Sequence, residues 1–285
     1  MAEGVQTAGR AEAGACPSCG GGLVGDYCHG CGEKRTGARD LTLRHFLRDA
    51  AQELTSLDSK LFRTLRALLF KPGLLTAEWV AGRRVPYLKP LNLCLGVLAL
   101  NLFLLSLHRP PTTYSMAFLL ANDAGGEVAK FLDKWAARRN TSREAIVERI
   151  NERWRGYGGM PPLQIFNAFL FALLLALVHL FSKRHFVEHL VFSLHFVSFS
   201  LLTSALLWPV YFVGGLDPKT RDMALSLLMM LLDAVYLFVA LRAFYERAAF
   251  KNLLRSVVLL AGFFAVSFVT YVVTLIAAMV VAAKY

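Results

Sequence analysis

Five long apolar runs constrain the fold of this 285-residue chain more than any other feature of its sequence. Each contains about twenty or more residues, the length at which an α-helix crosses the roughly 30 Å hydrocarbon core of a bilayer. The chain is also 56% hydrophobic, which is more than the core of a soluble domain requires. We therefore predict an all-α polytopic membrane protein with about five transmembrane helices. Their approximate bounds are 88–107, 163–182, 187–212, 222–244 and 257–282.

The segments around these runs predict the remaining organisation. Residues 1–15 contain no apolar cluster and are expected to form a disordered lead. Residues 16–36 hold four cysteines and several glycines. Residues 41–86 carry apolar side chains at spacings of three and four, which predicts amphipathic juxtamembrane helices at the membrane surface or against the bundle. The spans occupy residues 87–285, and a long extramembrane loop at 108–162 contains two predicted helices.

Basic residues near the ends of the spans predict the orientation of the chain. They fall on one side of the membrane if the amino terminus is cytoplasmic and the carboxyl terminus lies outside. The long loop would then be external, although its own basic residues run mildly against that placement. A formal net charge of +11 also fits basic cytoplasmic flanks in contact with anionic lipid. The flanking groups are Arg83, Arg84 and Lys89; Lys183 and Arg184; and Arg242, Arg247, Lys251 and Arg255.

Four cysteines near the amino terminus predict a metal site. Cys16, Cys19, Cys28 and Cys31 lie in CPSCGGGLVGDYCHGC, two Cys-x-x-Cys pairs separated by eight residues. Each pair can form a tight turn that presents two thiolates, and four thiolates close a tetrahedral zinc site. Such a site is structural, because no coordination position is left for water or substrate. We expect one structural zinc ion in a small cytoplasmic zinc ribbon. The competing interpretation, a redox thiol pair, requires only one Cys-x-x-Cys.

The segment after the cysteines resembles a known family. It reads LTLRHFLRDAAQELTSLDSKLFRTLRALLFKPG and continues with AGRRVPYLKP. Over roughly the first ninety residues, the chain is similar to the bacterial family known as domain of unknown function 3667. A later segment, VEHLVFSLHFVSF, also resembles that family. The resemblance implies a zinc ribbon joined to a multi-span domain in the bacterial cytoplasmic membrane, and it implies no activity. The resemblance rests on these residues: Leu57-Asp58, Arg63-Thr64-Leu65, Lys71-Pro72-Gly73, Gly82-Arg83-Arg84, Tyr87 and Pro90.

The stretch His185-Phe-Val-Glu188-His189 fits H-x-x-E-H, a pattern of one metallopeptidase class. There two histidines bind zinc and the glutamate acts as general base. The pattern is short, and no further carboxylate ligand lies nearby in the sequence. Glu188 is explained as well by the dipole at a helix start, and His185 by the membrane interface.

Polar residues deep within the spans are a second candidate site, because ionisable groups there usually face a partner or water. Glu188 and His195 share a helix face, and His195 and Asp233 should both approach the membrane midplane on antiparallel helices. We predict a contact between His195 and Asp233, or another polar neighbour, such as Asn101, for either residue. The contact either joins helices structurally or belongs to a proton or ion relay. In the relay, His179, His185 and His189 would surround the cytoplasmic mouth.

These features leave three classes of function open. The first is a non-enzymatic scaffold or sensor whose zinc ribbon contacts a cytoplasmic protein. A small transporter or channel that uses the midplane polar residues is the second, and a membrane metallohydrolase built on HFVEH is the third. Besides the lipid bilayer, the expected partner is therefore a protein. Nucleic acid is a poor candidate, because the cysteine segment has few aromatic residues and mixed charge.

Overall fold

The computed structural model describes residues 15–23, 25–33, 60–107, 120, 123, 125–157, 161–180, 182, 184–212, 217–245 and 249–284. These residues contain helices and no strand, which confirms the all-α prediction. The predicted lead up to residue 14, and the first part of the amphipathic segment at 41–59, lie outside them. The helices are α2 (Lys60–Phe70), α3 (Leu74–Val80), α4 (Pro90–Leu107), α6 (Glu127–Arg138), α7 (Arg143–Tyr157), α8 (Pro161–Val178), α9 (Phe186–Leu207), η2 (Trp208–Phe212), α10 (Pro218–Tyr245) and α11 (Ala249–Lys284).

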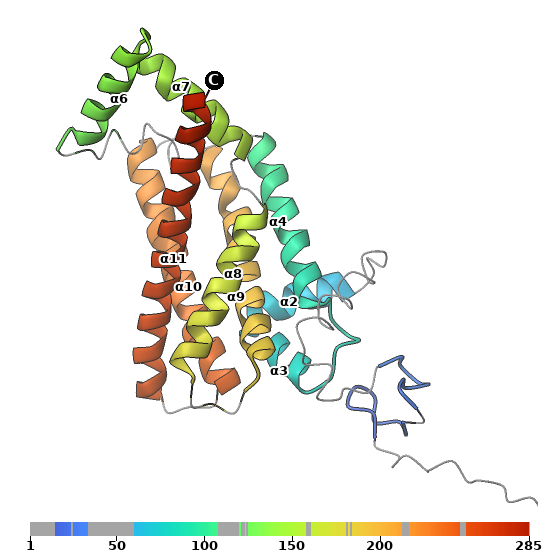
Figure 1. Ribbon diagram of the computed structural model, residues 1–285. Coiled ribbons are helices and arrows are strands. Elements are labelled where there is room, and N and C mark those ends of the chain that lie inside the picture. Colours follow the sequence, from blue (N-terminus) through green and yellow to red (C-terminus); the bar gives the residue numbers. More distant parts are fainter. Residues whose placement is uncertain are drawn as a thin grey trace, which may run out of the picture.

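The helices α4, α8, α9, α10 and α11 lie side by side in one bundle (Figure 1). Helix α9 is its centre and packs against α4, α8 and α10. It is apolar on all sides, and 72% of its most apolar window is buried, as expected of a helix surrounded by others. The corresponding window of α11 is only 18% buried. Because α11 is just as apolar, its large exposed surface is suited to contact with lipid.

Three described helices are long and apolar enough to cross a membrane: Phe186–Val210, Thr220–Tyr245 and Asn252–Ala277. They coincide with three of the five predicted runs. The other two runs form α4 and α8, which are apolar but shorter. Length and composition therefore support a membrane protein with three candidate spans among the described residues.

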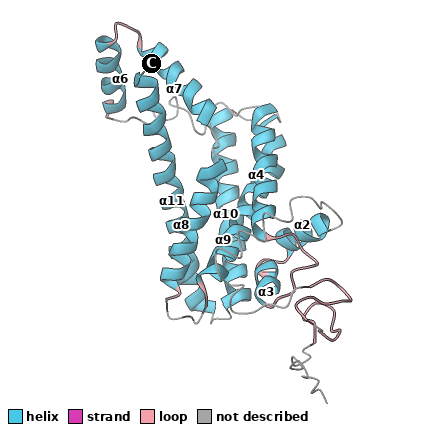
Figure 2. Ribbon diagram, turned by 45° about the vertical axis from the view of Figure 1, so that its right-hand side comes forward, coloured by secondary structure: helices cyan, strands magenta, loops and turns pink. Residues whose placement is uncertain are grey.

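The two ends of the bundle carry different additions (Figures 1 and 2). At one end, α6 and α7 of the long loop lie beside the last part of α11. Leu132, Ile150 and Leu275 are buried together there. At the opposite end, α3 packs against α9 and α10, and the cysteine segment lies beyond it. The cysteines and the carboxyl end are therefore on opposite ends of the bundle.

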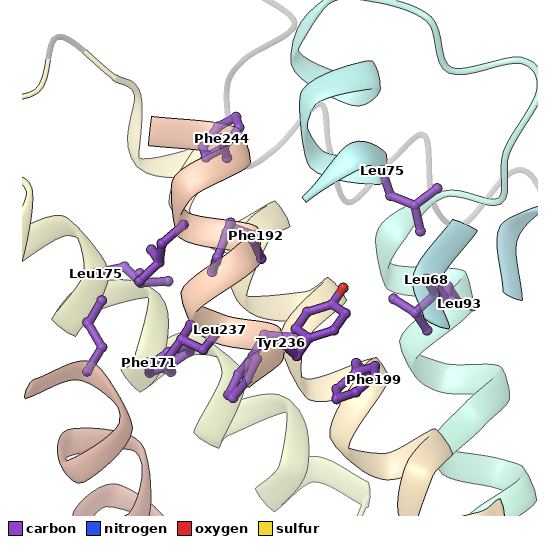
Figure 3. Close-up of a cluster of buried hydrophobic side chains, with 14 of the residues drawn as sticks. Leu68, Leu75, Leu93, Phe171, Leu175, Phe192, Phe199, Tyr236, Leu237 and Phe244 are labelled. Atoms are coloured by element: carbon purple, nitrogen blue, oxygen red, sulfur yellow. The ribbon is translucent and has the colours of Figure 1, made fainter. Parts of the chain in front are cut away.

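A continuous aromatic and aliphatic core joins α3 and the bundle (Figure 3). Phe171 of α8 and Phe196 of α9 are completely buried, with ring centroids 5.2 Å apart. Phe199 of α9 stacks on Tyr236 of α10 at 3.8 Å. Leu75 of α3 belongs to the same cluster. The short amphipathic helix is thus part of the bundle's core, the second of the two placements that its sequence allows.

Gly73, immediately before α3, lets this segment approach α10 very closely. Its φ of 83° lies in the left-handed region. A Cβ at this position would lie 2.9 Å from the backbone oxygen of Ala240 and 2.9 Å from the Cβ of Ala243. Both contacts are too short for a side chain, so glycine is required by backbone conformation and by space. The contact fixes the start of α3 against the bundle.

Candidate metal centre and polar cluster

The four predicted cysteine ligands lie together in the structure. Their sulfur atoms are all within 4.8 Å of one another. The Sγ atoms of Cys16 and Cys31 are 3.5 Å apart, as are those of Cys19 and Cys28. All four are free thiols. We call residues 15–23 and 25–33 the four-cysteine clip.

The clip consists of two turns with the same hydrogen bonds. In the first, the N–H of Cys16 donates to the carbonyl of Gly21, and the N–H of Gly20 donates to the carbonyl of Cys16. In the second, Cys28 and Gly32 repeat this arrangement with Glu33 as the acceptor. Gly20 and Gly32 both have φ of 75°, a conformation that favours glycine. Each Cys-x-x-Cys-Gly sequence therefore folds into an equivalent turn that presents its two thiols to the other.

The geometry and chemistry of this cluster fit one metal ion. Thiolates bound to zinc at 2.3 Å in a tetrahedron are separated by about 3.8 Å, and the observed sulfur separations bracket that value. Metal ligation needs the thiolate form. The backbone N–H groups of Cys31 and Gly30 lower the pKa of the Cys28 thiol from its ordinary 9.0 to about 6, whereas the neighbouring thiols and burial raise the pKa of Cys19 and Cys31. Cys28 is thus the thiol most ready to ionise. The clip could therefore hold one ion with four sulfur ligands.

Glu33, which the sequence does not single out, connects the clip to the helices. Its side chain is buried, and its Oε2 atom accepts hydrogen bonds from the backbone N–H groups of Arg84 and Val85 at 2.9 and 3.0 Å. The hydroxyl of Ser18 donates to the same oxygen. Arg84 and Val85 lie in the α3–α4 loop, residues 81–89. The only signal in the sequence is an acidic residue two positions after Cys31.

The structure shows the second form of the prediction, in which His195 and Asp233 each have another polar neighbour. Both residues are described and buried, but no hydrogen bond joins them. His195 Nδ1 instead lies 2.9 Å from the hydroxyl of Thr76 on α3. Asp233 accepts a hydrogen bond from the hydroxyl of Ser200 on α9 at 3.0 Å. The prediction used depth in the membrane alone, whereas the rotation of each helix decides which residues meet.

Asn101 is also not a partner of either residue. Its Nδ2 donates to the backbone carbonyl of Leu201 at 2.5 Å, which joins α4 to α9. An amide side chain that binds a carbonyl of a neighbouring helix is a common structural contact in membranes.

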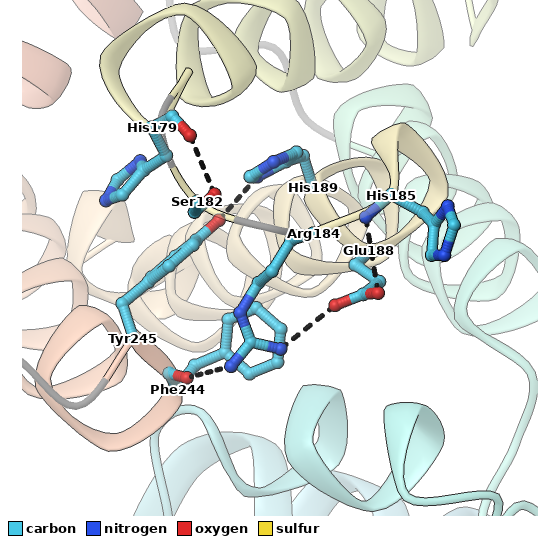
Figure 4. Close-up of polar contacts among 8 residues, drawn as sticks. All are labelled: His179, Ser182, Arg184, His185, Glu188, His189, Phe244 and Tyr245. Carbon is cyan, nitrogen blue, oxygen red and sulfur yellow. Dashed lines mark hydrogen bonds and ion pairs between the residues drawn. The ribbon is translucent and has the colours of Figure 1, made fainter.

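The residues of HFVEH point to different partners (Figure 4). His185 precedes α9 as its N-cap and is exposed, whereas His189 is buried. His189 Nδ1 lies 2.6 Å from the hydroxyl of Tyr245 at the end of α10. Glu188 accepts a hydrogen bond from the N–H of His185 and so caps the start of α9, where the sequence analysis had assigned it to the helix dipole alone. Within the described residues, the four cysteines are the only group of three or more His, Cys, Asp and Glu side chains placed to share a metal ion.

An arginine and two aromatic residues complete this polar cluster. Arg184 binds Glu188 Oε2 at 2.9 Å and the backbone carbonyl of Phe244 at 2.9 Å. Its guanidinium also lies 4.1 Å above the ring of Phe244. The ring of His179 stacks on Tyr245 at 3.9 Å. The cluster therefore ties the end of α8, the start of α9 and the end of α10 together (Figure 4).

Fold and site together define an all-helical, membrane-type protein with a cysteine cluster suited to one metal ion. Residues 58–101 match the model of the family "Protein of unknown function (DUF3667)". This match confirms the resemblance stated from the sequence. It covers α2, α3, the α3–α4 loop that receives Glu33, and the first part of α4. No curated protein and no solved structure matches the chain.

Proposed function

We propose that this chain is a five-span, non-enzymatic protein of the bacterial cytoplasmic membrane that presents a structural zinc ribbon to a protein partner in the cytoplasm. The helices α4 and α8 each contain 18 residues, or about 27 Å of helix, which is close to the thickness of the hydrocarbon core. An odd number of spans would also account for the clip and the carboxyl end lying at opposite ends of the bundle (Figure 1).

The positions of basic side chains support a cytoplasmic clip. Arg84, Lys89, Arg184 and Arg242 all lie near helix ends on the side of the bundle that carries the clip. An excess of basic residues marks the cytoplasmic side of bacterial membrane proteins. The reducing cytoplasm would also keep the thiols free to bind a metal ion.

Zinc is the metal we propose, because four thiolates in a tetrahedral arrangement are its usual structural ligands. All four positions are then filled by protein, so the site leaves none for water or a substrate. When bound, zinc supplies folding energy to a fragment that has almost no core of its own. The buried apolar residues of the clip are only Cys16, Leu23 and Cys28.

The observation that carries the docking role is that the clip keeps an aromatic side chain exposed apart from its contact with the membrane domain. That contact is made by Glu33, which Ser18 supports from within the clip. Tyr27 is 59% exposed, and His29, two residues further on, is exposed as well. Exposed aromatic side chains on a rigid turn are typical anchors of protein interfaces.

A photo-crosslinking residue in place of Tyr27 of the full-length chain tests this role in cells. We expect an adduct of one discrete mass, because a specific partner would contact this surface. Phe131 on α6 is the matched control position, since it is 56% exposed and lies at the opposite end of the bundle. Identical adducts at both positions, or adducts that persist when Cys28→Ser disrupts the clip, would contradict a docking role.

Asp233 favours a transporter or channel as the alternative function. It is 3% exposed within α10, and its Oδ1 atom has no hydrogen-bond partner. A buried carboxylate oxygen without a partner in a membrane helix is a candidate ion or proton site. Under this alternative, vesicles containing the protein would show a proton or cation flux that Asp233→Asn abolishes and Ser226→Ala on the same helix does not. Under the docking proposal, we expect no flux from either chain.

A further inference from the structure

The contact of Glu33 with the α3–α4 loop is more than a surface bond. Glu33 is only 2% exposed. A buried carboxylate needs compensating donors, and one oxygen of Glu33 has three: two backbone N–H groups and a hydroxyl. Hydrogen bonds to an ionised acceptor are about twice as strong as neutral ones. This carboxylate therefore holds the clip on the loop.

On the clip side, the position of Glu33 depends on the cysteine turn. The carbonyl of Glu33 accepts the N–H of Cys28 at 2.8 Å and so closes the second turn. The thiols of Cys28 and Cys31 lie within that turn. Because the fragment has almost no apolar core, a metal ion bound by the four cysteines would supply most of the stability of this turn. Loss of the ion would release the backbone that places the carboxylate.

On the membrane side, the loop that receives Glu33 is firmly tied to α3. The guanidinium of Arg84 lies 4.0 Å above the ring of Trp79, and its Nε donates to the carbonyl of Trp79 at 3.2 Å. Arg83 forms a two-point ion pair with Glu78, also on α3, with both distances at 2.6 Å. Movement of this loop would therefore displace α3.

Helix α3 in turn contacts the buried histidine of α9. Thr76, one helical turn before the end of α3, binds His195. His195 also lines a cavity of about 10 Å³, about the space of one water molecule, together with Leu75, Trp79 and Arg84. An unbroken series of contacts thus joins the cysteines, the loop, α3 and the interior of the bundle.

We propose that metal binding by the four cysteines places Glu33 on the Arg84 and Val85 amides, so that the clip docks on the membrane domain only in its metal-bound form. Docking then holds α3 in the position in which Thr76 binds His195. This inference rests on the proposed metal site and requires no partner protein. Besides the exposed surface around Tyr27, the clip then has a second binding surface at Glu33, which contacts the α3–α4 loop of the same chain.

Amide hydrogen exchange on the full-length chain in lipid nanodiscs tests this inference. The amides of Arg84 and Val85 are the probes, and metal content is measured on the same samples. We expect a chelator to raise their exchange by about tenfold or more, because each loses a charged acceptor. Glu33→Ala should raise exchange equally while the chain still binds its metal ion. Asp26→Asn, which removes an exposed acid of the clip, should leave both quantities unchanged.

The outcomes separate the two proposals. If the metal ion is present and its removal leaves the Arg84 and Val85 amides protected, metal-dependent docking is wrong and the metal site stands. Protected amides in metal-loaded Glu33→Ala also overturn it. If the unsubstituted chain binds no metal ion, the metal site fails and the inference with it. If the Glu33→Ala chain loses its metal ion, the test rests on the unsubstituted chain: faster exchange of the Arg84 and Val85 amides after chelation supports metal-dependent docking, and unchanged exchange contradicts it.

Discussion

Replacing Cys28 by serine is expected to reduce the metal content of the full-length protein from about one zinc ion per chain to nearly none. Cys28 is buried, and its thiol is held ready to ionise by the N–H groups of Cys31 and Gly30. Three remaining thiolates leave the ion open to water and to competing ligands, and structural zinc sites of this size lose their fold with the ion. Elemental analysis of the purified protein in detergent measures the change.

Cys94→Ser is the matched control for this experiment. Cys94 is also completely buried, but it lies in α4 and is not a member of the cysteine cluster. The substitution has the same chemistry, so it should leave the zinc content at about one ion per chain. A Cys28→Ser chain that keeps its ion, or an unsubstituted chain that carries a metal other than zinc, would contradict the proposed site.

Replacing Arg184 by alanine is expected to cost about 1–3 kcal/mol of folding free energy, the usual effect of leaving a buried acceptor without its donor, because the pair is only partly buried and the Arg184 side chain is 29% exposed. The side chain of Glu188 is 8% exposed and would keep its charge without the guanidinium that faces it. The carbonyl of Phe244 near the end of α10 would lose its donor as well. Unfolding of the detergent-solubilised protein, followed by circular dichroism against denaturant, measures the loss.

Two further variants define what this loss means. Arg138→Ala removes an exposed arginine of α6 and should change stability by less than about 0.5 kcal/mol. Glu188→Gln introduced into the Arg184→Ala chain should recover part of the loss, because it removes the unpaired charge. A loss below about 1 kcal/mol for Arg184→Ala, or no recovery in the double variant, would show that the ion pair does not hold the helix ends together.

Helices were the part of the fold that the sequence predicted well. One of the two helices predicted in the long loop, Glu127–Arg139, is α6, which ends one residue earlier, at Arg138. The apolar runs all became helices of the bundle because spacing and composition act on neighbouring residues. The number of membrane spans is less determined, since α4 and α8 are shorter than the apolar runs suggested.

The candidate sites differ in how much the sequence could predict. The cysteine cluster was predictable because a Cys-x-x-Cys turn is local, and two of them have few ways to pair. His195 was expected to meet Asp233 or another polar neighbour, and the neighbour is Thr76, which the sequence did not single out. Depth along a helix follows from residue number, whereas the direction of a side chain depends on how the helix packs. Glu33 went unnoticed because its hydrogen-bond donors are backbone N–H groups 51 and 52 residues away in the sequence.

The sequence by itself determined the helical membrane-type architecture, the four-cysteine pattern and the resemblance to domain of unknown function 3667, since all three depend on residues close together in the chain. Only the tertiary structure decided where polar side chains find partners. It placed Glu33 on the Arg84 and Val85 amides, His189 on Tyr245, and Arg184 between two helices. The physical reason is that a buried polar group needs a hydrogen-bond partner, and the packing of the whole bundle decides which groups lie close enough to be that partner.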